Sequence, residues 1–262
     1  MSPTSSQSIA VLTVAGSDPS GGAGIQADLK TFAVHGCYGM AALTALTAQN
    51  TTGVSAIHAV PLPFVAEQLR MVRADIPPLA IKIGMLGTAG LVATVAEALA
   101  DYRGPLVVDP VMVATSGARL LQPEAEEALR TLLVPRATLV TPNLPEAAVL
   151  LGEEEPGHWA QRTGVALLLK DGHGQKARVH DRLYLPDGTQ QAFAHDRIAS
   201  RNTHGTGCTL SAAIAARLAR GESLSVAVSA AVAWVGELVA ASWDHPLGAG
   251  KGPLLHGILG AR

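Results

Sequence analysis

The sequence predicts an α/β fold in which a mostly parallel central sheet carries helices on both faces. Short apolar runs of strand length alternate with longer segments of helical pattern through most of the 262 residues. Polar or charged residues repeatedly follow the apolar runs, and a composition of 48% hydrophobic and 15% charged residues supplies a large core. Such alternation is typical of parallel βαβ units. Because we find no internal repeat and no linker, we expect a single domain over residues 1–262, with residues 1–8 flexible.

The chain opens with a strand, a glycine-rich loop and a helix. Residues 9–15 (IAVLTVA) form a short apolar run between turn residues, which predicts a buried strand. The loop 16–24 follows, and residues 25–34 have helical spacing. The loop has neither the Lys-Ser/Thr pair of a P-loop nor the glycine spacing of the dinucleotide fingerprint. We interpret it as a backbone that approaches a small ligand, with a plain flexible connection as the alternative.

The next part of the chain predicts further elements with clear boundaries. Residues 39–49 form an apolar segment that ends in a polar turn, where Gln49 can offer a donor and acceptors to the edge of a heterocycle. We then expect a helix over 63–73, a strand over 79–85 and a helix over 88–100. Thr88 is the expected N-cap of the last helix.

Three later strands each end at a polar or charged residue. These strands and the residues that follow them are 105–108 with Asp109, 137–140 with Asn143, and 165–169 with Lys170. A loop is expected over 113–117, a helix over 123–133, and another helix from Glu146 to residue 151. Open α/β sheets place their ligands at the carboxyl ends of strands, so these side chains are expected at one rim of the sheet.

The last third predicts a β-hairpin and two consecutive helices. Residues 178–185 and 190–198 flank a Pro-Asp-Gly turn, which indicates a hairpin. Helices are expected over about 206–220 and 223–242, before an irregular glycine-rich tail. Residues 224–243 are the most apolar long stretch. Their many Ala and Ser residues, and Glu237 among them, favour a buried helix over a membrane span.

The stretch HGTGCTLSAA, residues 204–213, combines a glycine-flanked turn with a helix N-terminus. The first amides of a helix have no internal partners and carry partial positive charge, so a phosphate or an oxyanion is a suitable ligand. Cys208 falls in the first turn, where we expect its thiolate to be favoured. Gly221 is placed to end the helix. A tight turn beside a small buried cysteine is the alternative that these residues leave open.

Asp109, Glu146 and Lys170 have the chemistry that phosphoryl transfer requires. Its transition state spreads negative charge, which cations and oriented donors must meet. Mg²⁺ needs only one or two carboxylates, and a lysine can neutralise phosphate charge. Structural roles remain open for each residue: Asp18, Asp109 and Asn143 as turn caps, Glu146 as a first-turn carboxylate, and Lys170 as a solvated strand end.

Charge and cysteine usage exclude several classes of partner. The formal net charge is −2 without a basic block, and aromatic residues make up 3% of the chain. Nucleic acid and anionic membranes are therefore not expected as partners. Cys37 and Cys208 have no metal-ligand spacing and no disulfide framework, and the N-terminus lacks the plan of a signal peptide. We expect a cytoplasmic protein.

Six stretches together resemble a known family. They are AGSDPSGGAGIQADLKTF (15–32), ALTAQNT (45–51), KIGML (82–86), DPVMVATSG (109–117), TPNLPEA (141–147) and NTHGTGCTLSAAIAA (202–216). In this order they are similar to the hydroxymethylpyrimidine and phosphomethylpyrimidine kinases of thiamine biosynthesis, within the ribokinase-like superfamily. The resemblance implies a three-layer ribokinase-like fold, ATP and Mg²⁺ as cosubstrates, and a homodimer. It also implies phosphorylation of 4-amino-5-hydroxymethyl-2-methylpyrimidine and then of its monophosphate.

The resemblance also implies a role for each matched residue. Gln49 would bind the pyrimidine, and the same pocket would be bordered by Gly16, the loop 21–24, Asp28 and Met85. Asp109 and Glu146 would lie at the metal, and Asn143 and Lys170 at ATP. The anion hole would be formed by Gly205, Thr206, Gly207 and Cys208. Cys208 as the catalytic base is a hypothesis, because many relatives in the superfamily carry an aspartate there.

Two departures and two alternatives accompany the resemblance. The segment 152–164 is short, so a helix there is expected to be truncated or rebuilt. Asp171 stands where the family more often has glycine, and it either weakens ATP binding or points to solvent. A pyridoxal or pyridoxine kinase is the nearest alternative function, and a catalytically silent protein that binds vitamin metabolites is a second one. A nicotinamide-dependent reductase lacks its glycine fingerprint here.

Overall fold

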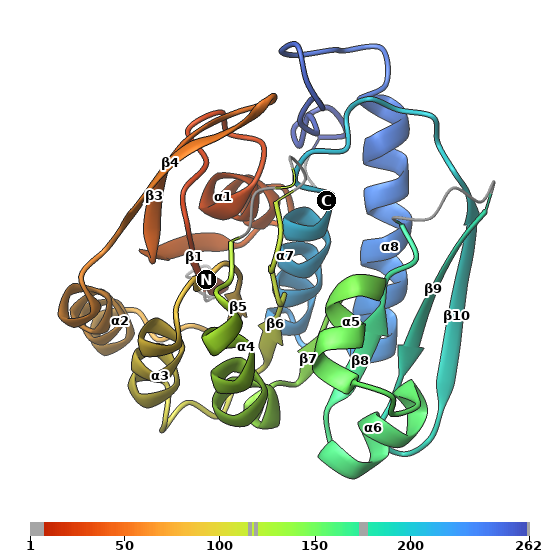
Figure 1. Ribbon diagram of the computed structural model, residues 1–262. Helices are drawn as coiled ribbons and strands as arrows, with labels where there is room; N and C mark the ends of the chain where they lie inside the picture. Colours follow the sequence, from red (N-terminus) through yellow and green to blue (C-terminus); the bar gives the residue numbers. More distant parts are fainter. Residues whose placement is uncertain (1–7, 115–116, 118–119, 173–177, 261–262) are drawn as a thin grey trace, which may run out of the picture.

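A computed structural model describes residues 8–114, 117, 120–172 and 178–260 (Figure 1). The flexible N-terminus that the sequence predicts lies outside these residues, apart from Ser8. Residues 115 and 116 of the expected 113–117 loop also lie outside them.

The centre of the molecule is an eight-stranded sheet with the order β10-β9-β8-β7-β6-β5-β1-β2. Every neighbouring pair is parallel except the two that involve β9, which runs antiparallel to both β8 and β10. The mostly parallel sheet and the hairpin are thereby confirmed. The strands are β1 Ala10–Ala15, β2 Tyr38–Leu43, β5 Ala80–Ile83, β6 Leu106–Val108, β7 Leu139–Val140, β8 Ala166–Leu169, β9 Arg178–Tyr184 and β10 Gln190–Asp196.

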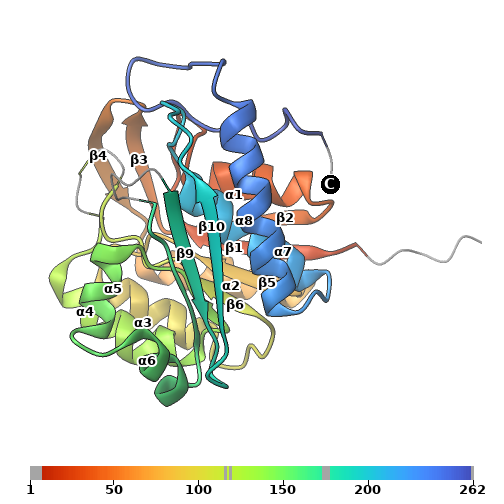
Figure 2. The ribbon, with the colours of Figure 1, turned by 90° about the vertical axis from the view of Figure 1, so that its right-hand side faces the viewer.

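Helices cover both faces of this sheet, which gives the expected three layers (Figure 2). One face carries α1 Gly24–Val34, α7 Thr206–Ala219 and α8 Leu224–Ala241. The other carries α2 Leu62–Asp75, α3 Ala89–Ala98, α4 Pro123–Ala128, α5 Leu144–Leu151 and α6 Pro156–Thr163. Strand residues alternate between the two layers because successive side chains point to opposite faces. In β1, for example, Leu12 and Val14 pack toward α2 and α3, and Val11 packs toward α7.

The segment 39–49 differs from its expected course. It forms two strands instead of one, because β2 ends at Leu43 and β3 Ala45–Asn50 leaves the main sheet. Thr44 holds the corner between them: its amide donates to the Ala15 carbonyl at 3.0 Å, and its hydroxyl donates to the Met85 carbonyl at 2.7 Å. β3 pairs only with β4 Gly53–Ala59, a strand that the sequence reasoning missed. The β3–β4 pair forms a separate two-stranded flap beside the sheet (Figure 2).

Several helix boundaries follow their local signals. The Thr88 hydroxyl accepts a hydrogen bond from the Leu91 amide at 3.3 Å, which confirms the N-cap of α3. Gly221 adopts a φ of 85° directly after the residue that caps α7. The helix expected over 123–133 is divided, because α4 passes into a wider π-type turn over Leu129–Leu133. The short segment 152–164 still contains a helix, the eight-residue α6.

α8 is the one helix among the described residues that is long and apolar enough to cross a membrane, with a mean hydropathy of 1.8. One of its sides packs against α7 and the sheet and buries Ala227, Ala231, Trp234 and Leu238. Another part of its surface faces the pocket described below. Both contacts fit the core helix that the sequence predicts.

Candidate active site

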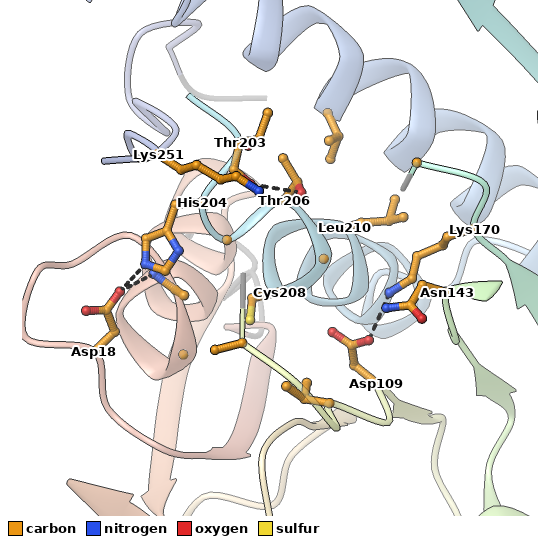
Figure 3. Close-up of a pocket in the computed structure, with 18 of the residues that line it drawn as sticks. Asp18, Asp109, Asn143, Lys170, Thr203, His204, Thr206, Cys208, Leu210 and Lys251 are labelled. Carbon is orange, nitrogen blue, oxygen red and sulfur yellow. Dashed lines mark hydrogen bonds and ion pairs between the residues drawn. The ribbon is translucent and has the colours of Figure 1, made fainter. Parts of the chain in front are cut away.

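A pocket of about 520 Å³ lies at the carboxyl ends of the parallel strands. The residues after β1, β5, β6, β7 and β8 meet the N-terminus of α7 there, as open α/β sheets place their ligand sites. Figure 3 shows Asp18 and His204 on one side, Asp109 and Lys170 on the other, and Cys208 between them.

The structure brings nearly all of the expected site residues together. Those that line the pocket are Gly16, Gln49, Met85, Asp109, Asn143, Glu146, Lys170, Gly205, Thr206, Gly207 and Cys208. They come from segments up to 192 residues apart in the chain (208 − 16). The strand-end pattern therefore predicted correctly that these residues meet in one pocket.

Asp28 is the exception, and its expected place at the pocket wall is wrong. Its side chain is fully buried under the pocket floor, where the Lys82 ammonium lies 2.8 Å from Oδ2 and 3.0 Å from Oδ1. The Thr13 hydroxyl donates to Oδ2 at 2.6 Å. Lys82 lines the pocket while Asp28 does not. Asp28 therefore acts on the site through Lys82, because a buried charge requires a partner.

The turn before α7 depends on a glycine that no other residue can replace without strain. Gly205 has a φ of 81°, and a Cβ added there would overlap the Gly22 carbonyl oxygen of the first loop. The two loops can meet only because the side chain is absent. The first amides of α7 then face the pocket without side-chain caps. This arrangement suits an anionic ligand.

Cys208 is half-buried, and the thiolate character expected for it is wrong. Burial raises the pKa of the Cys208 thiol to about 11. Lys82 and a hydrogen bond from the Gly24 amide favour the thiolate, whereas the carboxylates of Asp28 and Asp109 disfavour it. Removal from water thus outweighs the favourable position at the helix N-terminus.

Asp109 and Lys170 form an ion pair, with Oδ1 and Nζ 3.0 Å apart. Oδ1 also accepts from the Thr141 hydroxyl at 3.1 Å, and Oδ2 accepts from the Ser211 hydroxyl at 3.3 Å. Burial alone would raise the pKa of Asp109, but Lys170 and Lys82 outweigh it and hold the pKa below its usual value. Asp109 is therefore a carboxylate, and Lys170 is not a solvated strand end.

Asn143 and Glu146 have a structural role that the sequence reasoning kept as an alternative. They form the capping box of α5, in which each side chain accepts from the other's backbone amide at 2.9 Å. Burial raises the pKa of the Glu146 carboxyl, and the nearby Asp109 carboxylate raises it further, against the effect of Lys170. Both residues nevertheless line the pocket.

The donor set fits a magnesium ion that keeps most of its water. Asp109 and Glu146 supply hard carboxylate oxygens in the same pocket, and each raises the energetic cost of ionising the other. A divalent cation would relieve that repulsion. Within the described ranges no group of three His, Cys, Asp or Glu residues could form a closed cage. Mg²⁺ needs none, because one or two carboxylates usually hold it.

Two parts of the site escaped the sequence reasoning. His204 lines the pocket and lies with Nε2 2.7 Å from Asp18 Oδ2 and 3.4 Å from the Gln49 amide nitrogen. Asp18 in turn accepts from the amides of Gly22 and Ala23, so this carboxylate joins the glycine loop to the α7 turn. Lys82 was also missed, although a lysine inside the apolar run LAIKIGM was a signal of a buried ion pair.

Asp171 does not line the pocket. Its amide donates to the Asp181 carboxylate at 2.8 Å, and its own side chain is partly exposed. The structure therefore does not support an extra carboxylate directed at a nucleotide, and Asp181 is the acidic residue of this wall.

The chain is similar to curated proteins over nearly its whole length. It is 46% identical to the hydroxymethylpyrimidine/phosphomethylpyrimidine kinase of Rhizobium meliloti, over 94% of this chain and 96% of that protein. It is 44% identical to the thiamine biosynthesis multifunctional protein ThiED of Corynebacterium glutamicum, over 96% of this chain. The chain spans about a third of the length of that relative and of its Corynebacterium efficiens counterpart, at 34% and 35%.

Solved structures of two kinds of kinase resemble the fold. The phosphomethylpyrimidine kinase of Clostridium difficile 630 is 40% identical with a TM-score of 0.76, over 87% of this chain and 98% of that one. The pyridoxal kinase of Staphylococcus aureus in complex with AMP-PCP and pyridoxal is 36% identical with a TM-score of 0.84, over 96% and 94%.

The three-layer fold, the pocket at the strand ends and these relatives define the class of the protein as a phosphotransferase. The model of the family described as phosphomethylpyrimidine kinase matches residues 18–255. The chain belongs to this family.

Proposed function

We propose that this enzyme uses ATP and Mg²⁺ to phosphorylate 4-amino-5-hydroxymethyl-2-methylpyrimidine, and then phosphorylates the monophosphate to the diphosphate, in thiamine biosynthesis. One observation carries the proposal. A single pocket holds Gln49, the first amides of α7, which have no side-chain cap, and the Lys170–Asp109 pair. A ring bound at Gln49 would direct its hydroxymethyl group toward those amides.

Each part of the pocket then has a task in the transfer. The Gln49 amide binds the edge of the ring, and Gly16 and Met85, which lie next to each other, form part of the same pocket wall. The amides of Gly205 to Cys208 meet the negative charge that develops on the transferred group. Lys170 neutralises phosphate charge, and Asn143 borders the nucleotide. Asp109 and Glu146 hold Mg²⁺, which neutralises charge on the nucleotide phosphates when it is bound.

Cys208 in its thiolate form takes the proton of the attacking hydroxyl as transfer proceeds. Because burial raises the pKa of the thiol to about 11, only a small fraction of the enzyme carries this thiolate at neutral pH. Lys82 and the Gly24 amide stabilise that thiolate before it accepts the proton. Most of the rate enhancement would come from the backbone amides and the lysines, because phosphoryl transfer depends mainly on positioning and charge.

We further propose that residues 1–262 act as one kinase domain, as a homodimer in the cytoplasm. One sheet carries strands drawn from residues 10 to 196, which supports a single domain. The flap and α2 expose apolar side chains at Leu46, Ile57 and Phe64, which a second subunit would cover.

The test is release of ADP from Mg-ATP with three acceptors: the hydroxymethylpyrimidine, its monophosphate and pyridoxal. We expect turnover with both pyrimidines. Turnover of the monophosphate alone would restrict the enzyme to the second step. No turnover with any acceptor would contradict the proposal and favour a protein that binds such metabolites without catalysis.

Pyridoxal kinase activity is a second candidate, because a pyridoxal kinase matches the fold with a TM-score of 0.84 over 96% of the chain. Its substrate also carries a hydroxymethyl group on a heterocycle. Pyridoxal turnover above that of both pyrimidines would replace the proposed substrate and leave the chemistry of transfer unchanged.

A further inference from the structure

Lys251 is the lysine of the pocket whose charge the protein does not neutralise. Lys82 pairs with Asp28, and Lys170 pairs with Asp109. Lys251 lines the same pocket with an exposed side chain and has no hydrogen-bond or ion-pair partner within the described ranges. A cation held at a pocket without a counterion is available to an anionic ligand.

The backbone of Lys251 is fixed on both sides. The Gly250 amide donates to the Thr51 hydroxyl in the β3–β4 turn at 3.2 Å. On the other side, the Gly252 carbonyl accepts from the His204 amide at 3.0 Å, directly before the α7 turn. In Figure 3 the Lys251 side chain runs toward the turn that carries Thr203 and Thr206. The ammonium is therefore attached to a defined place in the site, not to a free tail.

A second hollow of about 290 Å³ adjoins the main pocket at this point. Lys251, Gln49 and His204 line both spaces, so the lysine lies where the two hollows adjoin, together with the residue proposed to bind the ring. His204 directly precedes the anion-binding turn. A phosphate attached to the hydroxymethyl group of a ring at Gln49 would lie near this junction.

We propose that Lys251 binds the phosphate of the monophosphate substrate and thereby selects it for the second phosphorylation. This inference rests on the proposed function. The first substrate is a neutral alcohol, whereas the second is a dianion that must enter a pocket also lined by the carboxylates of Asp18, Asp109, Glu146 and Asp181. An uncommitted ammonium offsets that repulsion. A charge-assisted contact with phosphate is the strong kind of hydrogen bond.

The two reactions also differ in proton balance. In the first, the alcohol oxygen forms the new P–O bond, the bond between the γ-phosphorus and the bridging oxygen of ADP breaks, and the alcohol proton must leave. In the second, an oxygen of the dianionic phosphate forms the bond and no proton is lost. Cys208 should therefore matter more for the first reaction, and Lys251 more for the second.

The experiment compares wild type, Lys251→Met and Lys251→Arg on both pyrimidines by steady-state ADP release. We expect Lys251→Met to lower kcat/KM for the monophosphate about 10- to 100-fold, mainly through KM, because one charge-assisted contact is lost. The alcohol reaction should change less than about threefold, a difference typical of an exposed residue with no contact to that substrate. Lys251→Arg should restore most of the activity toward the monophosphate.

Arg103→Met is the matched control. Arg103 is exposed, donates to the nearby Ala100 and Tyr102 carbonyls, and lies before β6, at the end of the sheet opposite the pocket. The substitution Arg103→Met removes one positive charge far from the pocket, so the rates of both reactions should stay the same.

Three outcomes would overturn the assignment: an unchanged preference for the monophosphate in Lys251→Met, an equal loss on both substrates, or a matching loss in Arg103→Met. Calorimetric binding of the monophosphate without nucleotide separates this inference from the proposed function. Wild-type binding that Lys251→Met weakens supports the subsite even if turnover fails, and equal binding by both proteins contradicts it.

Discussion

The buried pair of Lys82 and Asp28 shows how one residue can support a site that it does not enter. Both side chains are fully buried, and their charged atoms lie 2.8 Å apart. Lys82 is in turn a positive group beside Cys208. The sequence contained half of this information, because a lysine within LAIKIGM requires a buried acidic partner. The partner itself depends on the packing of α1 on β1 and β5, which no local pattern encodes.

Lys82→Met should destabilise the fold by about 3–5 kcal/mol, because it leaves the Asp28 carboxylate buried without a counterion. The double variant Lys82→Met with Asp28→Asn should be less destabilised than the sum of the single variants. Urea denaturation of all four proteins measures the coupling. Additive losses would show that the two charges do not stabilise each other.

Cys208 allows a direct test of the proton acceptor. Cys208→Ala should lower kcat for the alcohol about 100-fold if the thiolate is a general base. The wild-type rate should rise from neutral toward alkaline pH, since the pKa of the thiol is raised to about 11 and the thiolate fraction grows tenfold per pH unit below it. That rise should vanish in the Ala variant. Near-normal turnover of Cys208→Ala would leave the backbone amides as the main catalytic device.

At the scale of elements, the glycine turn before α7 is the most constrained connection of the site. The sequence predicted the turn and the helix, because two glycines precede a run of helix formers. It did not indicate that the Gly22 carbonyl occupies the space of a Gly205 side chain. Contacts between loops 180 residues apart arise only in the folded chain.

Gly205→Ala and Gly221→Ala form a matched pair at this helix. Each forces alanine into a positive φ, of 81° and 85°, at a strain on the order of 1–3 kcal/mol. Only at Gly205 does the added Cβ also overlap another backbone, whereas nothing lies within 4 Å at Gly221. We therefore expect the larger fall in melting temperature, and the loss of phosphoryl transfer, in Gly205→Ala alone. Equal effects in both variants would contradict this reading of the turn.

Glu146 at the start of α5 completes a capping box and is also proposed to hold Mg²⁺. The substitution Glu146→Gln separates these two roles. Glu146→Gln keeps a side chain that can complete the capping box, so the free energy of unfolding should change by no more than about 0.5 kcal/mol. It removes the negative charge, so the Mg²⁺ concentration for half-maximal activity should rise. Glu146→Ala should lower both stability and activity. An unaltered Mg²⁺ requirement in Glu146→Gln would confine Glu146 to the cap.

The features of the whole molecule that could be predicted are those that depend on the alternation of strands and helices along the sequence. The parallel sheet, its two helical layers, the hairpin and the rim of polar strand ends were all predicted. The departure of β3 from the sheet was not, because the apolar run 39–49 continues without a break through Thr44. The corner there depends on hydrogen bonds to Ala15 and Met85, which lie on other strands or loops.

Stability of the whole chain should fall as the pH drops from about 6.5 to 4. Burial lowers the pKa of both His35 and His256 from 6.5 to about 4, so each ring stays neutral in the folded state where the unfolded chain takes up a proton. The stabilisation is complete above 6.5 and decreases by about 1.4 kcal/mol per pH unit for each ring. Urea denaturation across this range should show the slope. His35→Gln and His256→Gln should flatten it, and the exposed His58→Gln should not.

Below pH 4 the Asp18 carboxylate also makes the stability of the fold depend on pH. Burial would raise the pKa of Asp18, but hydrogen bonds from His204 and Ser20 outweigh it and lower the pKa. Its contribution is present above the ordinary value near 3.8 and is lost as the pH falls through the lower folded-state value. Acid should therefore separate the glycine loop from the α7 turn late in the transition.

Residues 250–252 contact both the segment before the α7 turn and the flap. The Gly252 amide donates to Arg201 and its carbonyl accepts from His204, while Gly250 rests against Thr51 of the flap. Residues 250–252, about forty positions after the anion-binding turn, thus connect the two sides of the pocket. A deletion that begins before residue 250 would open the site while it removes, of the residues to which we assign a role in binding or catalysis, only Lys251. Any further domain fused after the kinase must be attached downstream of residue 252.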